Sequence, residues 1–108
     1  MIFQYTYQQV LDGSKTQTRR RAGAKQRYYV GKTYAVQPGR GKVNVGRIRI
    51  TEIREIDRAG NISESDARAE GFESSDAFRA MWEKMYGHAA LDEPCIALTF
   101  TRMDGDPS

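Results

Sequence analysis

The clearest helical pattern in the chain is an apolar stripe between residues 75 and 87. Its members recur at positions i, i+3, i+4 and i+7, namely Phe78, Met81, Trp82 and Met85. This spacing places the four side chains on one helix face, which predicts an amphipathic helix whose stripe packs in the core. Ser75 suits the N-cap of this helix, and Gly87 suits its end.

Two shorter helices are predicted upstream of this stripe. Apolar residues over 7–11 are spaced three and four apart, which predicts one or two helical turns that stop at Gly13. Ser63, with Asp66 three residues later, resembles a capping box. It predicts a short helix through Glu70 that is closed by the following glycine.

Alternating apolar residues predict strands elsewhere in the chain. The longest is expected over 43–56, where a change of phase beside Gly46 predicts a bulge or a sharp bend, and Ile53 and Ile56 show a second slip of phase after Ile50. The last strand is expected over 94–103, with alternate apolar residues on one face. Shorter strands are expected over 1–6 and 33–37.

The remaining segments connect these elements. The polar, glycine-containing stretch 22–27 predicts a mobile loop, and residues 104–108 are expected to fray. No repeat or linker interrupts the pattern. Bent strands with short helices between them predict a single α+β domain over 1–108, a small β-barrel of about five to six strands with two to three short helices.

Composition narrows the setting in which such a chain works. At 108 residues and 12.3 kDa the chain can bury one modest core. No apolar run approaches the roughly 20 residues that a membrane span needs, and no secretory signal is recognisable. The one cysteine, Cys95, excludes an internal disulfide and lies in an apolar run, where a small buried side chain is expected. A cytoplasmic protein without a membrane partner is the expectation.

Basic residues are concentrated in the first half of the chain. The formal net charge is +3, and Asp12 is the only acid before Glu52. This asymmetry predicts that the N-terminal half faces a polyanion or a phosphorylated ligand. Basic residues that merely decorate loops would give the same composition.

Candidate chemistry gathers in the stretch 13–21, which reads Gly-Ser-Lys-Thr-Gln-Thr-Arg-Arg-Arg. Alternate residues of an extended strand share a face, so Lys15 and Thr18 would point to opposite sides of a regular strand. A bend or bulge at either end would bring these two side chains together over one pocket. The alternative is a solvated basic edge strand, in which lysine and arginine discourage aggregation.

The same stretch carries a family resemblance. Its Gly13-x-Lys15-x-x-Thr18-x-Arg20 spacing resembles the signature of the ASCH domains, which are related to the PUA-like barrels. Further segments resemble that family in the same order, at residues 29–36, 62–72 and 96–100. The resemblance covers nearly the whole chain and implies a single PUA-like barrel domain.

Small single-domain bacterial ASCH members include N4-acetylcytidine amidohydrolases, which this chain resembles in size and in three motif positions. The resemblance implies Lys15 as general base, Thr18 as nucleophile and Glu70 as proton donor. It implies a small nucleoside substrate, for which the expected binding residues are Thr16, Arg19, Arg20, Arg21 and Tyr28. We expect no cofactor and no metal, because no His, Cys and Asp cluster has metal-ligand spacing.

Amide hydrolysis by these residues requires an uncharged Lys15. The ordinary lysine pKa is about 10.4, so the site would have to lower it by roughly 3 pH units. Burial and neighbouring arginines lower a lysine pKa, whereas Glu70 raises it unless Glu70 carries the proton that a donor needs. The two groups are therefore expected to titrate as a coupled pair. Backbone amides around 13–16 and an arginine guanidinium are alternative donors to the oxyanion.

Each of the three residues also has an ordinary structural explanation. Lys15 would be a surface cation at a helix end, and Thr18 would be a β-branched strand residue. Glu70 would be a solvent-facing residue of a last helical turn, where acids are disfavoured. That local conflict is weak support for a functional role.

Two other functions fit the same residues. An RNA-binding PUA-like module would use the basic N-terminal half, with Tyr28, Tyr29 and Tyr34 stacking on bases. A ribonuclease would use Lys15 and an arginine to stabilise a phosphorane, although a single histidine, His88, makes acid–base cleavage less natural. The expected partner is a nucleoside, with RNA as the alternative, and the chain is expected to be a monomer or a weak homodimer.

Overall fold

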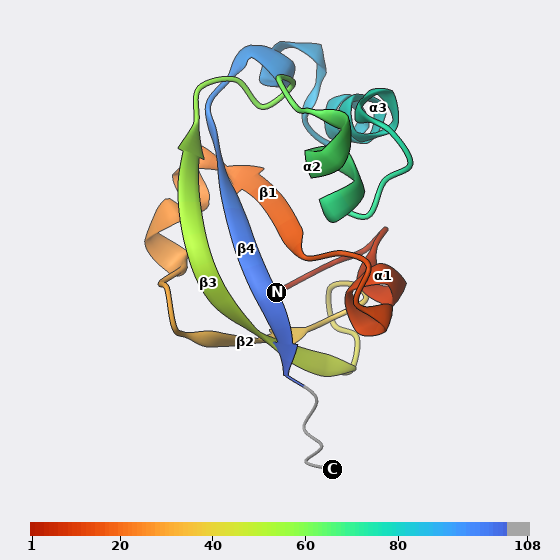
Figure 1. The fold of residues 1–108 in the computed structure, drawn as a ribbon, viewed down its shortest axis with the longest axis vertical. Helices are drawn as coiled ribbons and strands as arrows, with labels where there is room; N and C mark the ends of the chain where they lie inside the picture. Colours follow the sequence, from red (N-terminus) through yellow and green to blue (C-terminus); the bar gives the residue numbers. More distant parts are fainter. Residues whose placement is uncertain (104–108) are drawn as a thin grey trace.

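The computed structural model describes residues 1–103, apart from the side chains of Lys25 and Gln26. The expected fraying of 104–108 lies outside the described residues. The elements follow in the order α1 (Tyr7–Asp12), β1 (Gln17–Arg21), the 3-10 helix η1 (Ala22–Arg27), β2 (Thr33–Val36), β3 (Gly46–Ile56), α2 (Glu64–Ala69), α3 (Ser75–Tyr86), the 3-10 helix η2 (His88–Asp92) and β4 (Cys95–Met103) (Figure 1).

The strands form one antiparallel sheet in the order β1-β4-β3-β2. The long strand β3 pairs with β4, and the register between them shifts once, between Ile50 and Glu52. An extra residue at such a bulge bends the strand and increases its twist, and the sheet curls accordingly around the core. The expected α+β, PUA-like fold is confirmed, as a half-barrel in which the described sheet has four strands instead of five to six.

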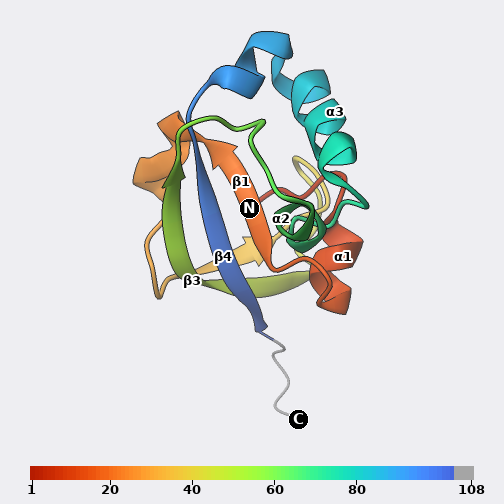
Figure 2. The ribbon, with the colours of Figure 1, turned by 45° about the horizontal axis from the view of Figure 1, so that its top comes forward.

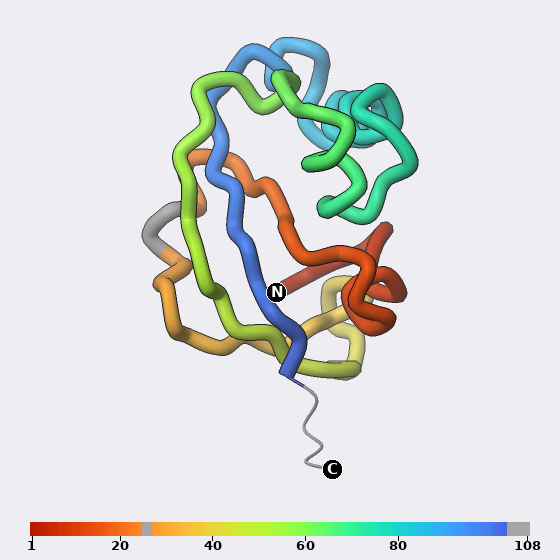
Figure 3. Tube along the Cα trace, in the orientation of Figure 1, coloured from red at the N-terminus to blue at the C-terminus, as the bar shows by residue number. Residues whose placement is uncertain are grey.

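The missing strand lies at the N-terminus. Residues 1–6 form only an isolated parallel bridge, between Ile2 and Gln37, and then turn into α1. In the Cα trace this segment passes between α1 and the connection from α2 to α3 (Figure 3). Because residues 1–6 do not join the sheet as a strand, their side chains can face the space between the α-helices and the sheet.

Three local expectations need correction. The segment Ala22–Arg27 is a 3-10 helix and not an irregular loop. The N-cap of α3 is Ser74, whose side chain accepts a hydrogen bond from Ala77 N, so the cap lies one residue before the predicted one. The phase change beside Gly46 is the start of β3 and not a bulge, whereas the second slip, between Ile50 and Ile53, does coincide with the shift in register.

The α-helices α1, α2 and α3 lie along one side of the curled sheet (Figures 1 and 2). Within the sheet, Ile50, Ile96 and Leu98 form one buried cluster, against which Tyr28 and Tyr34 pack, and burial of each such side chain is worth roughly 1.5–3 kcal/mol. Of the apolar stripe on α3, Phe78 and Trp82 are buried in a second cluster. None of the helices in the described part of the chain is long and apolar enough to span a membrane.

Candidate active site

A cavity of about 140 Å³ lies between β1, α3 and the N-terminal segment. Its walls are largely aromatic, formed by Phe3, Tyr5, Phe72, Phe78, Trp82 and Tyr86. Its polar lining includes Gln4, Thr6, Lys15, Thr18, Arg19, Arg20 and Glu70. A dry protein cavity of about 150 Å³ can hold a benzene molecule. The cavity therefore has room for one six-membered ring.

The chain bends where the helix α1 gives way to β1. Gly13 ends α1 with a φ of 87°, a conformation open to glycine at little cost. Lys15 N then donates to Gln9 O (3.0 Å), and regular pairing with β4 begins only at Gln17. Because Lys15 precedes the pleated strand and Thr18 lies within it, both side chains reach the same cavity. The structure thus contains the predicted bend.

Glu70 is carried to this cavity by α2. Ser63 caps the helix by accepting from Asp66 N (3.0 Å), as the sequence predicts. Gly71 then reverses the chain with a φ of 94°, and a Cβ on Gly71 would lie 3.5 Å from Lys15 Cβ. The end of α2 is therefore packed directly on the residue before β1.

The carboxylate of Glu70 is held from two sides. Oε1 accepts from the backbone N–H of Arg19 (3.0 Å), and Oε2 accepts from Nε2 of Gln17 (3.0 Å). Lys15 Nζ lies 3.6 Å from Oε1 and donates to the backbone carbonyl of Glu70. Side chains of Lys15 and Glu70 are only 3% and 2% exposed. Burying such a pair is costly, and these additional hydrogen bonds offset part of that cost.

Burial lowers the pKa of Lys15 to about 8. The positive charge of Arg20 acts in the same direction, whereas Glu70 opposes it. The Lys15 ammonium nitrogen lies 5.9 Å and 5.8 Å from the ring centroids of Phe3 and Phe72, which exclude water from it. At pH 7 about a tenth of Lys15 side chains are therefore uncharged, far more than for an ordinary lysine.

The two arginines that line the cavity differ in what they bind. The Arg19 guanidinium donates to the carbonyls of Ala59 (3.1 Å) and Asn61 (3.2 Å), so it anchors the connection before α2. Arg20 donates to Ile2 O (2.8 Å) and lies 5.1 Å from the Phe3 ring centroid. Arg20 Nε is buried without a hydrogen-bond partner among the described residues. That N–H can donate a hydrogen bond to a ligand oxygen.

Three residues expected to bind substrate do not line this cavity. Thr16 is exposed, and its backbone N–H donates to Ala69 O (2.8 Å). Arg21 pairs with Glu93 at the surface (3.0 Å). Tyr28 packs on Tyr34, with ring centroids 5.4 Å apart, and so belongs to the core.

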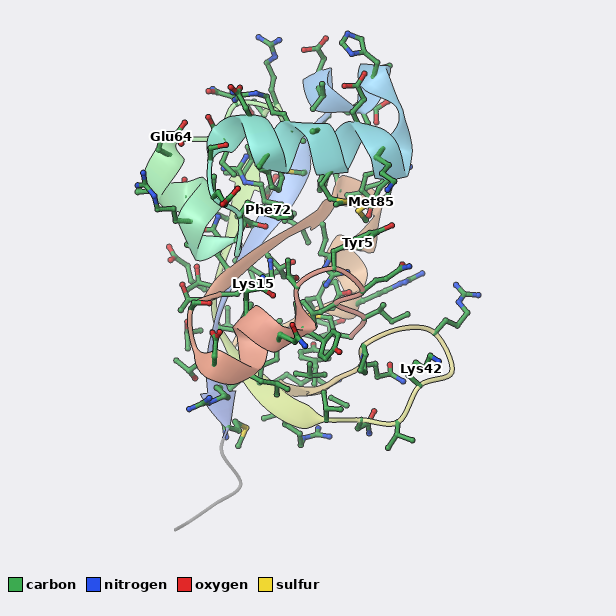
Figure 4. The ribbon with its side chains drawn as sticks, turned by 90° about the vertical axis from the view of Figure 1, so that its right-hand side faces the viewer. Tyr5, Lys15, Lys42, Glu64, Phe72 and Met85 are labelled. Atoms are coloured by element: carbon green, nitrogen blue, oxygen red, sulfur yellow. The ribbon has the colours of Figure 1, made fainter. Side chains whose placement is uncertain are left out.

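Several lining residues were not anticipated from the sequence. The apolar stripe of α3 packs in the core and also lines the cavity. All four of its residues line the cavity, although only a core role was expected. Tyr5 and Met85 are 45% and 46% exposed and so form part of the rim. Figure 4 shows Lys15, Phe72, Tyr5 and Met85 in the zone between α1 and α3. The aromatic residues Phe3 and Tyr5 were the sequence feature that could have indicated that the N-terminal segment lines a cavity.

Other reactive groups lie away from this chemistry. Cys95 is buried as expected, and burial raises the pKa of its thiol to about 11, which suppresses the reactive thiolate. Among residues 1–103, no group of three or more His, Cys, Asp or Glu residues could hold a metal ion. His88 is exposed on η2, with Nδ1 2.9 Å from Glu83 Oε2.

Comparison with known proteins shows which solved structures share this fold. No family model matches this sequence, and no curated protein is similar to it at a significant level. Among solved structures, an ASCH domain from Lactobacillus crispatus JV V101 superposes with a TM-score of 0.67 at 19% identity, over 89% of this chain and 69% of that one. The chain has the fold of an ASCH domain.

Two further structures share the ASCH fold seen here. Protein EF3133 from Enterococcus faecalis V583, described as DUF984, gives a TM-score of 0.65 at 21% identity, over 90% of this chain and 66% of that one. The hypothetical protein PH0355 gives a TM-score of 0.72 at 16% identity, over 95% of this chain and 96% of that one. This chain thus spans about two thirds of EF3133 and nearly all of PH0355.

Proposed function

We propose that this protein is an amidohydrolase that removes the acyl group from N4-acylated cytosine nucleosides or bases, yielding cytidine and acetate from N4-acetylcytidine. One observation carries the proposal: the Thr18 hydroxyl lines the same small cavity as Lys15, whose pKa is lowered to about 8. An alcohol becomes a competent nucleophile when a base within reach removes its proton during attack.

The proposed reaction assigns one step to each residue. Thr18 Oγ1 attacks the acyl carbon while neutral Lys15 takes the hydroxyl proton. The C–N bond then breaks, and Glu70 delivers a proton to the departing exocyclic nitrogen. Water then attacks the acyl-Thr18 ester while Glu70 takes a proton from the water, and Lys15 returns its proton to Thr18 Oγ1 as the acid leaves. Of the two kinds of oxyanion donor expected from the sequence, we favour the arginine, because Arg20 Nε is buried without a hydrogen-bond partner among the described residues and can donate to the oxyanion.

The cavity supports a cytosine-sized substrate. Its volume of about 140 Å³ matches one six-membered ring, and its walls offer aromatic faces on which a base can stack. A ribose would then lie at the rim beside Tyr5 and Met85. This arrangement favours a base or nucleoside over a large acylated substrate.

The direct test is release of cytidine from N4-acetylcytidine by the purified protein, followed by chromatography. Lys15→Met, Thr18→Val and Glu70→Gln should each lower kcat by about 10²–10⁴-fold, the usual contribution of a general acid or base. Thr16→Val is the matched control, because Thr16 is an exposed threonine of the same segment, and it should leave kcat unchanged. Full activity in the first three variants would reject the proposed roles.

A second candidate function is RNA binding, favoured by one surface feature. Tyr29 is 57% exposed, and Lys32 Nζ lies 5.4 Å from its ring centroid. Arg49 donates to Gly31 O (2.7 Å) and so adds a second cation beside them. A base could stack on Tyr29 while its phosphates meet the cations.

RNA binding is tested with a fluorescein-labelled single-stranded RNA and fluorescence anisotropy. Affinity should fall steeply with added salt, and Tyr29→Ala should weaken it by about 1–3 kcal/mol. Tyr28→Phe is the control, because Tyr28 packs in the core. No binding at low salt would dismiss this function.

A further inference from the structure

The amide of Gln17 lies between Glu70 and a distant arginine. Gln17 Nε2 donates to Glu70 Oε2 (3.0 Å), and Gln17 Oε1 accepts from a guanidinium nitrogen of Arg54 (3.2 Å). Gln17 itself is only 5% exposed, whereas the Arg54 side chain is 40% exposed. A chain of hydrogen bonds therefore runs from the protein surface to the carboxylate in the cavity.

This chain crosses three strands. Gln17 belongs to β1 and Arg54 to β3, and β4 lies between those two strands (Figure 1). At the crossing, Ala97 of β4 is the register partner of both Arg19 and Arg54. A methyl side chain at this position leaves room for Arg54 to reach over β4 toward Gln17. A larger residue on that face would block the path.

Arg54 and Glu70 favour the same orientation of the Gln17 amide. A guanidinium only donates hydrogen bonds, so Arg54 faces the amide oxygen, and a carboxylate only accepts them, so Glu70 faces the amide nitrogen. Without Arg54 the amide oxygen loses this donor, and the amide is held less firmly against Glu70. A partly exposed cation thus strengthens the positioning of a buried group.

A second contact holds Arg54 itself in place. Asp66 Oδ2 lies 3.9 Å from the Arg54 guanidinium and 3.7 Å from that of Arg19. Asp66 also belongs to α2, the helix that carries Glu70, and its N–H binds the Ser63 cap. The helix that brings Glu70 to the cavity is therefore tied to β3 through the same arginine.

We propose that Gln17 and Arg54 are positioning residues that hold the Glu70 carboxylate against Lys15 in its productive orientation. Arg19 N–H restrains one carboxylate oxygen and Gln17 restrains the other, so neither rotation nor withdrawal of Glu70 is free. The catalytic consequence of this inference rests on the proposed function. The structural consequence, which concerns only the distance between Glu70 and Lys15, does not.

The catalytic consequence is tested by steady-state kinetics on N4-acetylcytidine. Gln17→Met and Arg54→Met should each lower kcat about ten- to hundredfold, the worth of one hydrogen bond to a charged group, with KM nearly unchanged. The double variant should be no slower than the slower single variant, because both break one link. Arg54→Lys should restore most of kcat, because an ammonium also donates to Gln17 Oε1. Arg58→Met, which removes an exposed arginine paired with Asp92, is the matched control. Additive losses, or an equal loss in Arg58→Met, would overturn the inference.

The structural consequence is tested without substrate, by NMR titration of the Lys15 side chain. Lys15 is faced by Glu70 from α2 and by Arg20 from β1, with Arg19, Asp66 and Arg54 behind them. Loss of the Arg54 charge alone would raise the pKa of Lys15. Withdrawal of Glu70 would lower it, because the ammonium loses its counter-charge.

We therefore expect the Lys15 titration midpoint to fall in both Gln17→Met and Arg54→Met and to stay in place in Arg58→Met. A rise in Arg54→Met, or an unchanged midpoint in both variants, would contradict the positioning role. Because this readout needs no turnover, it separates the two proposals. If the wild type is inactive but the midpoints shift as expected, the amidohydrolase proposal is rejected and the positioning role of Gln17 and Arg54 is kept. If the wild type is active but the midpoints do not shift, the amidohydrolase proposal is kept and the positioning role is rejected.

Discussion

Lys15 and Glu70 lie 55 positions apart in the sequence, yet Lys15 Nζ is 3.6 Å from Glu70 Oε1 in the interior of the protein. Two glycines with positive φ make the approach possible, Gly13 before β1 and Gly71 after α2. The result is a lysine whose surroundings favour the uncharged amine more than water does. Thr18 lines the same cavity, and the proposed amide hydrolysis rests on this combination of a threonine hydroxyl with a lysine of lowered pKa.

The lowered pKa of Lys15 makes stability depend on pH. The unfolded chain holds the Lys15 proton up to about pH 10.5, whereas the folded protein releases it near pH 8. Lys15 therefore opposes folding below about pH 8, and this penalty disappears as the pH rises to 10.5. Urea unfolding measures this effect as the free energy of unfolding of wild type minus that of Lys15→Met. This difference should increase by about 3 kcal/mol, in favour of wild type, as the pH rises between these limits. A constant difference across that range would contradict the lowered pKa.

Gly71→Ala should disturb both the backbone and the site. Its φ of 94° is unfavourable for alanine, and the new Cβ would lie 3.4 Å from Thr6 Cγ2 and Gln9 Cβ. We expect a loss of about 1–2 kcal/mol in the free energy of unfolding, measured with urea. Gly23→Ala is the matched control, because nothing lies within 4 Å of its added Cβ, and its effect should be near zero. Equal stability of the two variants would show that the turn after α2 tolerates a side chain.

Much of the fold is predictable from local patterns. The helix over 75–86 follows from its apolar period and caps, and the last strand follows from alternation over 95–103. The 3-10 helix over 22–27 was not predictable, because its glycine and polar residues give no apolar period. The single bridge at Ile2 was missed for another reason: whether a short apolar segment joins a sheet depends on what else lies at its edge.

The candidate site divides in the same way. The resemblance to the ASCH domains selected Lys15, Thr18 and Glu70, which do line one cavity. Gln17 carried no signal, because its contact with Glu70 depends on a helix more than fifty residues away. The α3 stripe was interpreted as core alone, since helical periodicity shows which residues share a face but not whether that face meets a void. The catalytic roles of Lys15, Thr18 and Glu70 stay predictions.

Cys95 should be inert in the folded protein. It is 1% exposed and the pKa of its thiol is raised to about 11, so thiolate is scarce and sheltered at neutral pH. We expect no reaction with a chromogenic disulfide reagent under native conditions and one reactive thiol per chain after denaturation. Rapid labelling of the native protein would place Cys95 in an accessible position that the fold does not give it.

Met81 should limit the size of the acyl group. It lies half-buried on α3 and lines the cavity, so Met81→Ala enlarges the space beside the substrate. We expect the ratio of kcat/KM for N4-benzoylcytidine to kcat/KM for N4-acetylcytidine to rise about tenfold. This is the lower end of the discrimination that contacts in an apolar pocket provide. Glu83→Ala, on the exposed face of α3, should leave the ratio unchanged. An unchanged ratio in Met81→Ala would place the acyl group away from this wall.

The most direct measurement of the central claim is the titration of Lys15 in the wild-type protein, followed by NMR of selectively labelled lysine Cε, with Lys15→Arg to assign the signal. The account predicts a midpoint near pH 8, matched by a rise in kcat/KM for N4-acetylcytidine through the same pH. A midpoint at the ordinary lysine value of 10.5 would mean that Lys15 stays charged and cannot act as the base.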